Sequence, residues 1–310
     1  APWLKACLFC VCTRGLGCWR TTCSSGPAHS IAHLPAMAQA GVKKTVTKTV
    51  MKRKVTHLIR AAAPAGKPTA ATTRQAKGAS SKPPAALTGI SGVCINLKTR
   101  PDRLVKVSKS VAKQAPWLNL ARMDAVDGRV APPPAKEVTR TWCTGHLAEL
   151  FHWYKKVTVP MSPGEMGCCG SHVKAWRMAA KSSKPLLVLE DDAVALPAFS
   201  STLAQAVKEA PKDIGMIFLS SKDRGSRTQA GKVLMTPSFV WTTVGYLIYP
   251  ATAKKLLAML PVDMPVDNFL AWHIKEGTIK AFSVKPACVR QAQTWNLGSD
   301  VPHSDDVAHQ

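Results

Sequence analysis

The chain has 310 residues and a formal net charge of +24 at pH 7. This length allows one large domain or two small ones, and no stretch approaches the ~18 apolar residues that a membrane-spanning helix needs. The charge is uneven. Residues 1–101 contain 16 of the 42 Lys and Arg residues and no Asp or Glu, whereas residues 102–310 contain the other 26 Lys and Arg residues and all 18 acidic residues. The basic character therefore belongs mainly to the N-terminal third.

Residues 1–89 are expected to form a disordered, basic leader. Ala, Lys, Thr, Pro, Ser and Gly dominate residues 41–89, which cannot bury enough apolar surface to offset the entropy of ordering. An acid-free leader is typical of an organelle transit peptide, and equally of an arm that binds nucleic acid or other anions nonspecifically. Five cysteines in residues 1–23 lack a second pair at zinc-finger spacing, so no zinc site is expected there.

Residues 90–298 show alternating strand and helix patterns, which predict one α/β domain followed by a polar tail at 299–310. Residues 220–232 are polar and contain Gly, so a mobile loop that acts as a lid is expected there. In chain order, the expected elements are a strand at 92–97, a helix at 101–114, a strand at 118–124, a short helix near 146–156, a helix at 163–181, a strand at 185–190, a helix at 197–209, a strand at 214–219, strands within 233–249, helices at 251–260 and 265–275, and a strand at 279–285.

The helix at 163–181 has a clear start signal. Ser162 and Glu165 have the spacing of a capping box, and Pro163 occupies the first helical position. Glu165, His172 and Trp176 then recur every three or four residues and share one helix face with Cys168 or Cys169.

Three adjacent carboxylates, Glu190, Asp191 and Asp192, follow the apolar run at residues 186–189. A buried strand would deliver this carboxylate triplet to the sheet edge where ligands of open α/β sheets bind. Clustered negative charges need a cation or donors to neutralise them, and hard divalent cations prefer carboxylate oxygens. Because side chains alternate along a strand, Glu190 and Asp192 should face one side and Asp191 the other. The alternative is a solvated acidic turn.

The order of motifs resembles glycosyltransferase family 25, the lipopolysaccharide and collagen β-galactosyltransferase group. Six matches occur in the family's order over about residues 91–295. They are the strand and turn at 95–103, Ala-Val-Asp-Gly at 125–128, the Gly-Glu-x-Gly-Cys-x-x-Ser-His segment at 164–172 with Trp176, Leu-Val-Leu-Glu-Asp-Asp at 187–192, the strand at 245–248, and Pro-Val-Asp at 265–267.

This resemblance implies a GT-A type fold and a UDP-sugar donor, with galactose as the expected sugar. It assigns a metal site to the triplet, where Asp192 is the favoured direct ligand and Glu190 or Asp191 acts directly or through water, with Mn²⁺ as the expected ion and Mg²⁺ as the alternative. It places a further six residues in donor binding: Asn96, Arg100, Arg103, Glu165, Asp191 and Gln291. For Arg100 and Arg103, a surface pairing with Asp102 is the structural alternative.

An inverting transfer, as the family performs, needs a base near the acceptor hydroxyl. Asp267 is the expected base and Asp263 the alternate, although Asp also favours helix caps. His172 is a further catalytic candidate, with a structural histidine as the alternative. Zinc bound by Cys168, Cys169 and His172 is also considered, but it lacks an evident fourth ligand.

The sequence thus predicts a metal-dependent, inverting hexosyltransferase that acts on a glycan or protein hydroxyl. A basic nucleic-acid-binding protein and an inactive transferase-like domain are the rival interpretations. The family's eukaryotic members suggest the secretory pathway, whereas the leader composition suggests an organelle.

Overall fold

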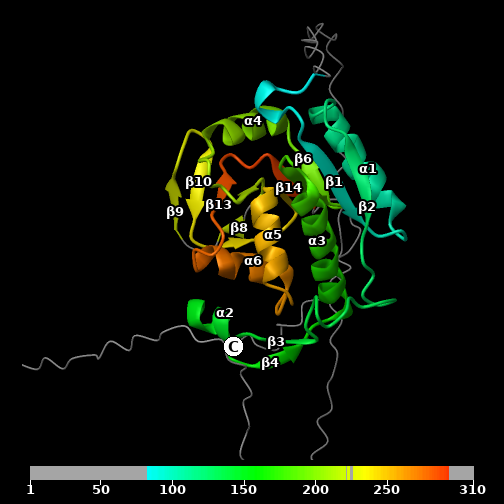
Figure 1. The fold of residues 1–310 in the computed structure, drawn as a ribbon, viewed down its shortest axis with the longest axis vertical. Helices are drawn as coiled ribbons and strands as arrows, with labels where there is room; N and C mark the ends of the chain where they lie inside the picture. The colour runs from blue at the N-terminus through cyan, green and yellow to red at the C-terminus, as the bar shows by residue number, and fades with distance from the viewer. Residues whose placement is uncertain (1–81, 221, 224–225, 293–310) are drawn as a thin grey trace, which may run out of the picture. The chain divides into compact units, whose positions relative to one another are not determined.

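The computed structural model describes residues 82–220, 222–223 and 226–292 and confirms the predicted α/β fold (Figure 1). Its main sheet contains β1 (Ser91–Asn96), β2 (Leu120–Asp124), β5 (Leu186–Glu190), β7 (Met216–Phe218), β9 (Arg227–Gln229), β10 (Leu234–Pro237), β12 (Gly245–Ile248) and β13 (Ala281–Val284). The strand order is β2-β1-β5-β12-β7-β13-β10-β9. β1 runs parallel to both β2 and β5, whereas β12 is antiparallel to β5 and β7, so the sheet is mixed.

Three small sheets and seven helices complete the described part. The small sheets pair β3 (Thr141–Cys143) with β4 (Thr158–Pro160), β6 (Ala193–Ala195) with β14 (Val289–Gln291), and β8 (Lys222–Asp223) with β11 (Val240–Trp241). The helices are the 3-10 turn η1 (Ala85–Leu87), α1 (Pro101–Gln114), α2 (Gly145–Leu150), α3 (Pro163–Lys181), α4 (Phe199–Glu209), α5 (Pro250–Ala258) and α6 (Val266–Lys275).

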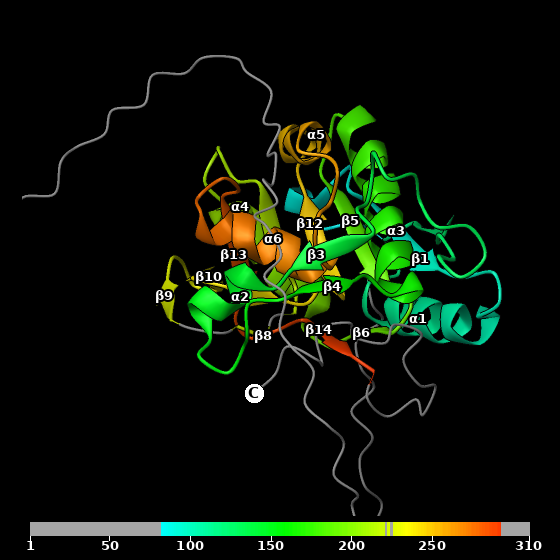
Figure 2. The same ribbon diagram turned by 90° about the horizontal axis from the view of Figure 1, so that it is seen from below.

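The main sheet separates two hydrophobic cores. In β5, Leu186 and Val188 pack with α3, α5 and α6, whereas Leu187 and Leu189 pack with α1 and α4. This follows from strand geometry, since alternate side chains point to opposite faces. Seen from below, α1 and α5 lie on opposite sides of β1, β5 and β12 (Figure 2). The central strands are therefore buried on both faces, and their carboxyl ends are where polar residues gather.

The predicted capping box at the start of α3 is confirmed. The Ser162 hydroxyl accepts a hydrogen bond from the Glu165 amide at 3.2 Å, and the Glu165 carboxylate accepts one from the Ser162 amide at 2.8 Å. Pro163 occupies the first turn, where its missing amide hydrogen is no loss. These contacts fix the first turn of the helix that carries Cys168 and His172.

Gly167 lets the loop after β2 lie directly on α3. A Cβ atom at this position would stand 2.6 Å from the Val126 carbonyl oxygen and 2.8 Å from the Gly128 amide nitrogen. Both neighbours are backbone atoms, which cannot rotate out of the way. Gly128 and Gly167, which both lie in motifs of the family resemblance, are thus in direct backbone contact.

Gly167→Ala is therefore expected to lower the free energy of unfolding by about 3 kcal/mol, because the added methyl group forces two backbones apart. Urea denaturation checks this. Gly170→Ala in the same helix is the matched control, since its Cβ would meet only side-chain atoms of Pro133 and Val126, at 3.1 Å or more. Equal losses in the two variants would contradict the backbone-contact explanation.

Two predicted elements differ from the structure. The helix expected at 146–156 ends at Leu150, and the next residues form an aromatic group in which Phe151 stacks on Trp153 and Trp241. The loop expected at 220–232 contains β8 and the edge strand β9, so its described part is paired backbone. All three residues of β9 are exposed, which removes the hydrophobic alternation that identifies strands in a sequence.

The described chain begins inside the segment expected to be the leader. Leu87 in η1 is fully buried in the core that contains α1 and α4, so the fold includes residues before 90. Residues 1–81 and 293–310 lie outside the described residues, and with them most of the predicted leader and the whole polar tail. Across the described ranges, the helices are all too short or too polar to cross a membrane.

Candidate functional site

The carboxylate triplet lies at the carboxyl end of β5, next to the carboxyl end of β1. Glu190 is the last residue of β5, and the parallel register pairs it with Ile95, so Asn96 at the end of β1 lies beside Asp191 just after β5. Parallel strands end at the same sheet edge, and ligands of open α/β sheets bind there. The location expected for the triplet is thus the one observed.

Asp191 points toward α1 and is held by two donors. The Asn96 amide donates to Oδ2 at 2.8 Å, and the Arg103 guanidinium donates to Oδ1 at 3.1 Å. Burial raises the pKa of Asp191 even though Asn96 and Arg103 oppose that change. Arg103 is itself 9% exposed, so this is a buried ion pair. Asp191 therefore uses its oxygens within the protein.

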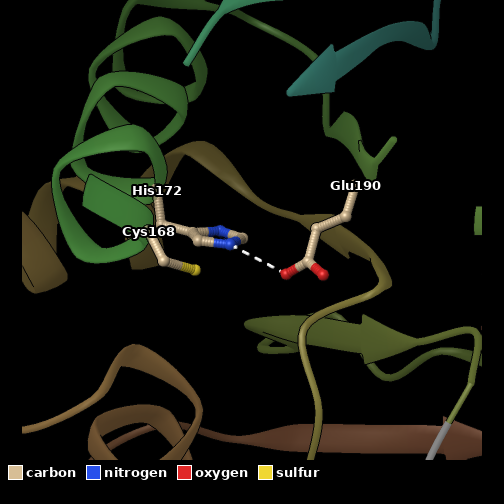
Figure 3. A group of neighbouring side chains, drawn as sticks. All are labelled: Cys168, His172 and Glu190. Carbon is tan, nitrogen blue, oxygen red and sulfur yellow. Dashed lines mark hydrogen bonds and ion pairs between the residues drawn. The ribbon is translucent and has the colours of Figure 1, made fainter. Parts of the chain in front are cut away.

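Glu190 points to the opposite face, toward α3, as strand alternation predicts. Its Oε1 lies 3.2 Å from His172 Nε2 (Figure 3). The same oxygen accepts a hydrogen bond from the Thr243 hydroxyl at 2.5 Å. Burial raises the pKa of Glu190, but His172 and Thr243 outweigh it and hold that pKa below its ordinary value. Glu190 is therefore charged at neutral pH.

His172 is connected to a buried hydrogen-bond chain behind it. Trp176 donates its ring N–H to the Tyr246 hydroxyl at 3.2 Å, and that hydroxyl lies 2.8 Å from His172 Nδ1. Burial raises the pKa of Tyr246, so the hydroxyl keeps its proton and can donate it to Nδ1. Nε2 then carries the ring hydrogen and donates to Glu190. The chain thereby orients both the ring and the carboxylate.

Tyr246→Phe is expected to lower the free energy of unfolding by about 1–3 kcal/mol, because it leaves two buried polar groups, on Trp176 and His172, without a partner. Urea denaturation measures this loss. Tyr249→Phe is the matched control, since the described residues offer the Tyr249 hydroxyl no hydrogen bond. An unchanged stability of Tyr246→Phe would show that the chain does not support the fold.

Asp192 differs from its two neighbours because it has a buried oxygen without a hydrogen-bond partner among the described residues. Oδ2 accepts from the Gln291 amide at 2.9 Å, whereas the buried Oδ1 has no hydrogen-bond partner among the described residues. Burial raises the pKa of Asp192 to about 6, with the charge of Glu190 as the second cause, against the opposing Gln291 hydrogen bond. A buried carboxylate oxygen without a donor is the kind of group that a cation satisfies.

The other residues expected to bind a donor have partners within the protein. Asn96 also receives a hydrogen bond from Arg122 at 2.9 Å, and Arg100 pairs with the exposed Asp102 at 3.1 Å. Glu165, which is buried, completes the helix cap. These contacts are structural, and a role of these side chains in donor binding stays a prediction.

The two candidate bases lie in different surroundings. Asp267 lies in the first turn of α6. Burial is the main cause that raises the pKa of the Cys168 and Cys169 thiols, and the charge of Asp267 raises it further. The half-buried Asp267 therefore lies close to α3. Asp263 is exposed, and its charge acts on His273 at the other end of α6. Of the two, Asp267 is the one whose charge acts on Cys168, which lies near Glu190, and the role of either residue as the base stays a prediction.

Several site residues were not identified from the sequence. Thr243 holds Glu190, and the preceding Thr242 has φ of 128°, which a β-branched residue rarely adopts. The sequence predicts only that Tyr246 lies in a strand and that Trp176 shares a helix face with His172. Cys169, considered as a zinc ligand, directs its sulfur to the Met264 carbonyl at 3.6 Å. Its neighbour Cys168 lies instead near His172 and Glu190.

Comparisons with known proteins bear on the family of this chain. The model of glycosyltransferase family 25 (LPS biosynthesis protein) matches residues 92–270. A glycosyltransferase 25 family member from Aedes aegypti is 30% identical over 221 residues, which are 64% of this chain and 35% of that protein. Procollagen galactosyltransferase 1-B from Xenopus laevis is 27% identical over 217 residues, or 62% and 34% of the two chains. A probable inactive glycosyltransferase 25 family member 3 from Bos taurus is 28% identical over 214 residues, or 62% and 35%.

The chain spans about a third of the length of these curated relatives. The family model matches more than half of the chain, and the matched region holds most of β1, all of α3 and β5, and the start of α6. It therefore includes the carboxylate triplet, His172 and Asp267. The chain belongs to glycosyltransferase family 25.

Proposed function

We propose that this protein is a glycosyltransferase that moves galactose from UDP-galactose to a hydroxyl group of a glycan or protein acceptor. Family membership supports the reaction class, and relatives named procollagen galactosyltransferase support the sugar. The observation that carries the proposal is the buried Oδ1 of Asp192, which has no partner among the described residues and lies at the ligand-binding edge of the sheet.

The residues at this edge fit a divalent cation, with Mn²⁺ as the proposed ion and Mg²⁺ as the alternative. Asp192 would hold it through Oδ1, and Glu190 would be the second carboxylate, since it is ionised at neutral pH. When bound, such a cation neutralises the diphosphate that leaves the sugar. Asp191 is not proposed as a ligand, because Asn96 and Arg103 occupy its oxygens.

The remaining residues are proposed to orient these carboxylates and to handle the acceptor proton. Gln291 holds Asp192, and Arg103 holds Asp191. Arg100 pairs with an exposed carboxylate, so it is proposed to turn to the donor phosphates when they bind. Asp267 is proposed to accept the proton of the acceptor hydroxyl as that oxygen displaces UDP from the opposite side of the sugar, which inverts the anomeric centre.

The test is UDP release from UDP-galactose by the full chain with Mn²⁺ and a panel of hydroxyl acceptors, with UDP-glucose as the comparison donor. Asp267→Asn is expected to lower kcat about a hundredfold or more while UDP binding stays intact, because it removes only the base. No release from any UDP-sugar by protein that binds UDP would favour an inactive transferase-like domain, the description carried by the Bos taurus relative.

A further inference from the structure

We propose that Cys168, His172 and Glu190 form a second cation site, which takes a borderline-soft ion of the zinc class. One ligand atom from each residue (sulfur, ring nitrogen and carboxylate oxygen) lies within 4.8 Å of the other two. Figure 3 shows the three side chains converging from α3 and the end of β5. This soft-ligand cluster shares Glu190 with the proposed all-oxygen site at Asp192 but adds a sulfur and an imidazole ligand, and its existence does not depend on the transferase activity.

The local fold explains why these side chains converge. Cys168 and His172 are four residues apart in α3, so both lie on the same helix face, one turn from each other. Glu190 ends a strand whose alternate side chains pack on that face. His172 is fully buried and has little freedom to move away. The fold therefore places two ligands from α3, Cys168 and His172, next to one ligand from the sheet, Glu190.

The ligand set selects a different ion from the one proposed at Asp192. Mn²⁺ and Mg²⁺ favour oxygen, whereas zinc accepts sulfur, imidazole nitrogen and carboxylate together. Three protein ligands and one open position are typical of zinc sites that admit water or a substrate. Tetrahedral zinc separates its ligand atoms by about 3.5 Å, and His172 Nε2 already lies 3.2 Å from Glu190 Oε1. Binding would require the sulfur of the half-buried Cys168 to close the remaining distance.

Tyr246 and Trp176, which lie behind His172, match the hydrogen-bond partners that orient histidine ligands in metal sites. A histidine ligand usually donates its other ring N–H to a fixed acceptor. The Tyr246 oxygen can accept this hydrogen bond from Nδ1 and keep the one from Trp176, because a hydroxyl has two acceptor positions. Nε2 is then free of its hydrogen and can bind the ion. The ion thus takes the place of the proton between His172 and Glu190.

Charge favours a cation at this place as well. Burial is the main cause that raises the pKa of the Cys168 thiol, and the negative charges of Glu190, Asp267 and Asp192 raise it further. No basic side chain is among the main causes of this pKa change. On binding, the thiol loses its proton to solvent and sulfur forms the bond to the ion, so one proton is released for each ion bound. The thiolate and the Glu190 carboxylate together balance the two charges of a zinc ion.

Co²⁺ is a spectroscopic probe of this site in the full chain, after dialysis against a chelator. The expected result is a sulfur-to-cobalt charge-transfer band, which zinc displaces. Cys168→Ser should remove the band and weaken zinc binding at least tenfold. Cys169→Ser is the matched control and should keep the band, since that sulfur faces the Met264 carbonyl in the core. Cys168→Ala provides the same test if the serine variant does not fold.

Asp192→Asn separates this proposal from the proposed function. It should abolish Mn²⁺-dependent UDP binding and leave the sulfur-to-cobalt band intact. A wild-type protein without the band, or a band unchanged by both Cys168 variants, would overturn the second site whatever the result with UDP. Loss of UDP binding alone would count against the transferase proposal and not against the soft-ligand cluster.

Discussion

Asp192→Asn is expected to make the metal-free protein more stable, by up to about 3 kcal/mol at pH 7. The reason is that the folded state buries an ionised carboxylate beside Glu190, with one oxygen that lacks a partner among the described residues. Asparagine keeps the shape and the Gln291 hydrogen bond but removes the charge. Urea denaturation of both proteins in EDTA measures the difference.

The sign of the pH dependence follows from the raised pKa of Asp192. Its pKa is about 6 in the folded protein and 3.8 as an ordinary value, so between these pH values the folded state binds the extra proton. Wild-type stability relative to Asp192→Asn should therefore fall as pH rises from about 4 to about 6, and then level off. A variant less stable than wild type at pH 7 in EDTA would contradict the buried-charge explanation.

Arg103→Met is expected to lower the free energy of unfolding by about 3 kcal/mol or more, since it leaves the Asp191 carboxylate buried without its counter-charge. The ion pair spans 3.1 Å, and both side chains are 11% exposed. Adding Asp191→Asn to this variant should restore most of the lost stability, because the uncompensated charge is then gone. Urea denaturation of the single and double variants checks both expectations.

Arg100→Met is the matched control for Arg103. The Arg100 side chain is 17% exposed and pairs with Asp102 at the same distance of 3.1 Å, but the Asp102 carboxylate is 44% exposed and keeps its hydration, so this ion pair adds little stability. Arg100→Met should therefore leave stability almost unchanged. Equal losses in Arg100→Met and Arg103→Met would indicate that packing of the long side chains, and not burial of charge, sets the effect.

Local patterns in the sequence predicted the parts of the site that depend on neighbouring residues. The capping box, the start of α3 and the opposite directions of Glu190 and Asp191 all follow from helix and strand periodicity. The buried pair of Arg103 with Asp191 is not among these, since the sequence predicts for Arg103 either donor binding or a surface pair with Asp102.

The remaining contacts depend on pairings between distant segments. Thr243 and Tyr246 reach Glu190 and His172 only because β12 inserts between β5 and β7, and no local pattern sets that strand order. Gln291 reaches Asp192 because the short strand β14 pairs with β6, and three-residue strands have too little periodicity to be recognised. The unused oxygen of Asp192 likewise becomes evident only when all its neighbours are in place.

Calorimetric titration of UDP into the full chain, with Mn²⁺ and with EDTA, is the most direct test of the proposed donor site. Wild type should bind UDP only when Mn²⁺ is present, and Asp192→Asn, folded and at least as stable, should not bind under either condition. Cation-independent UDP binding, or undiminished binding by Asp192→Asn, would contradict the central role given to the carboxylate triplet.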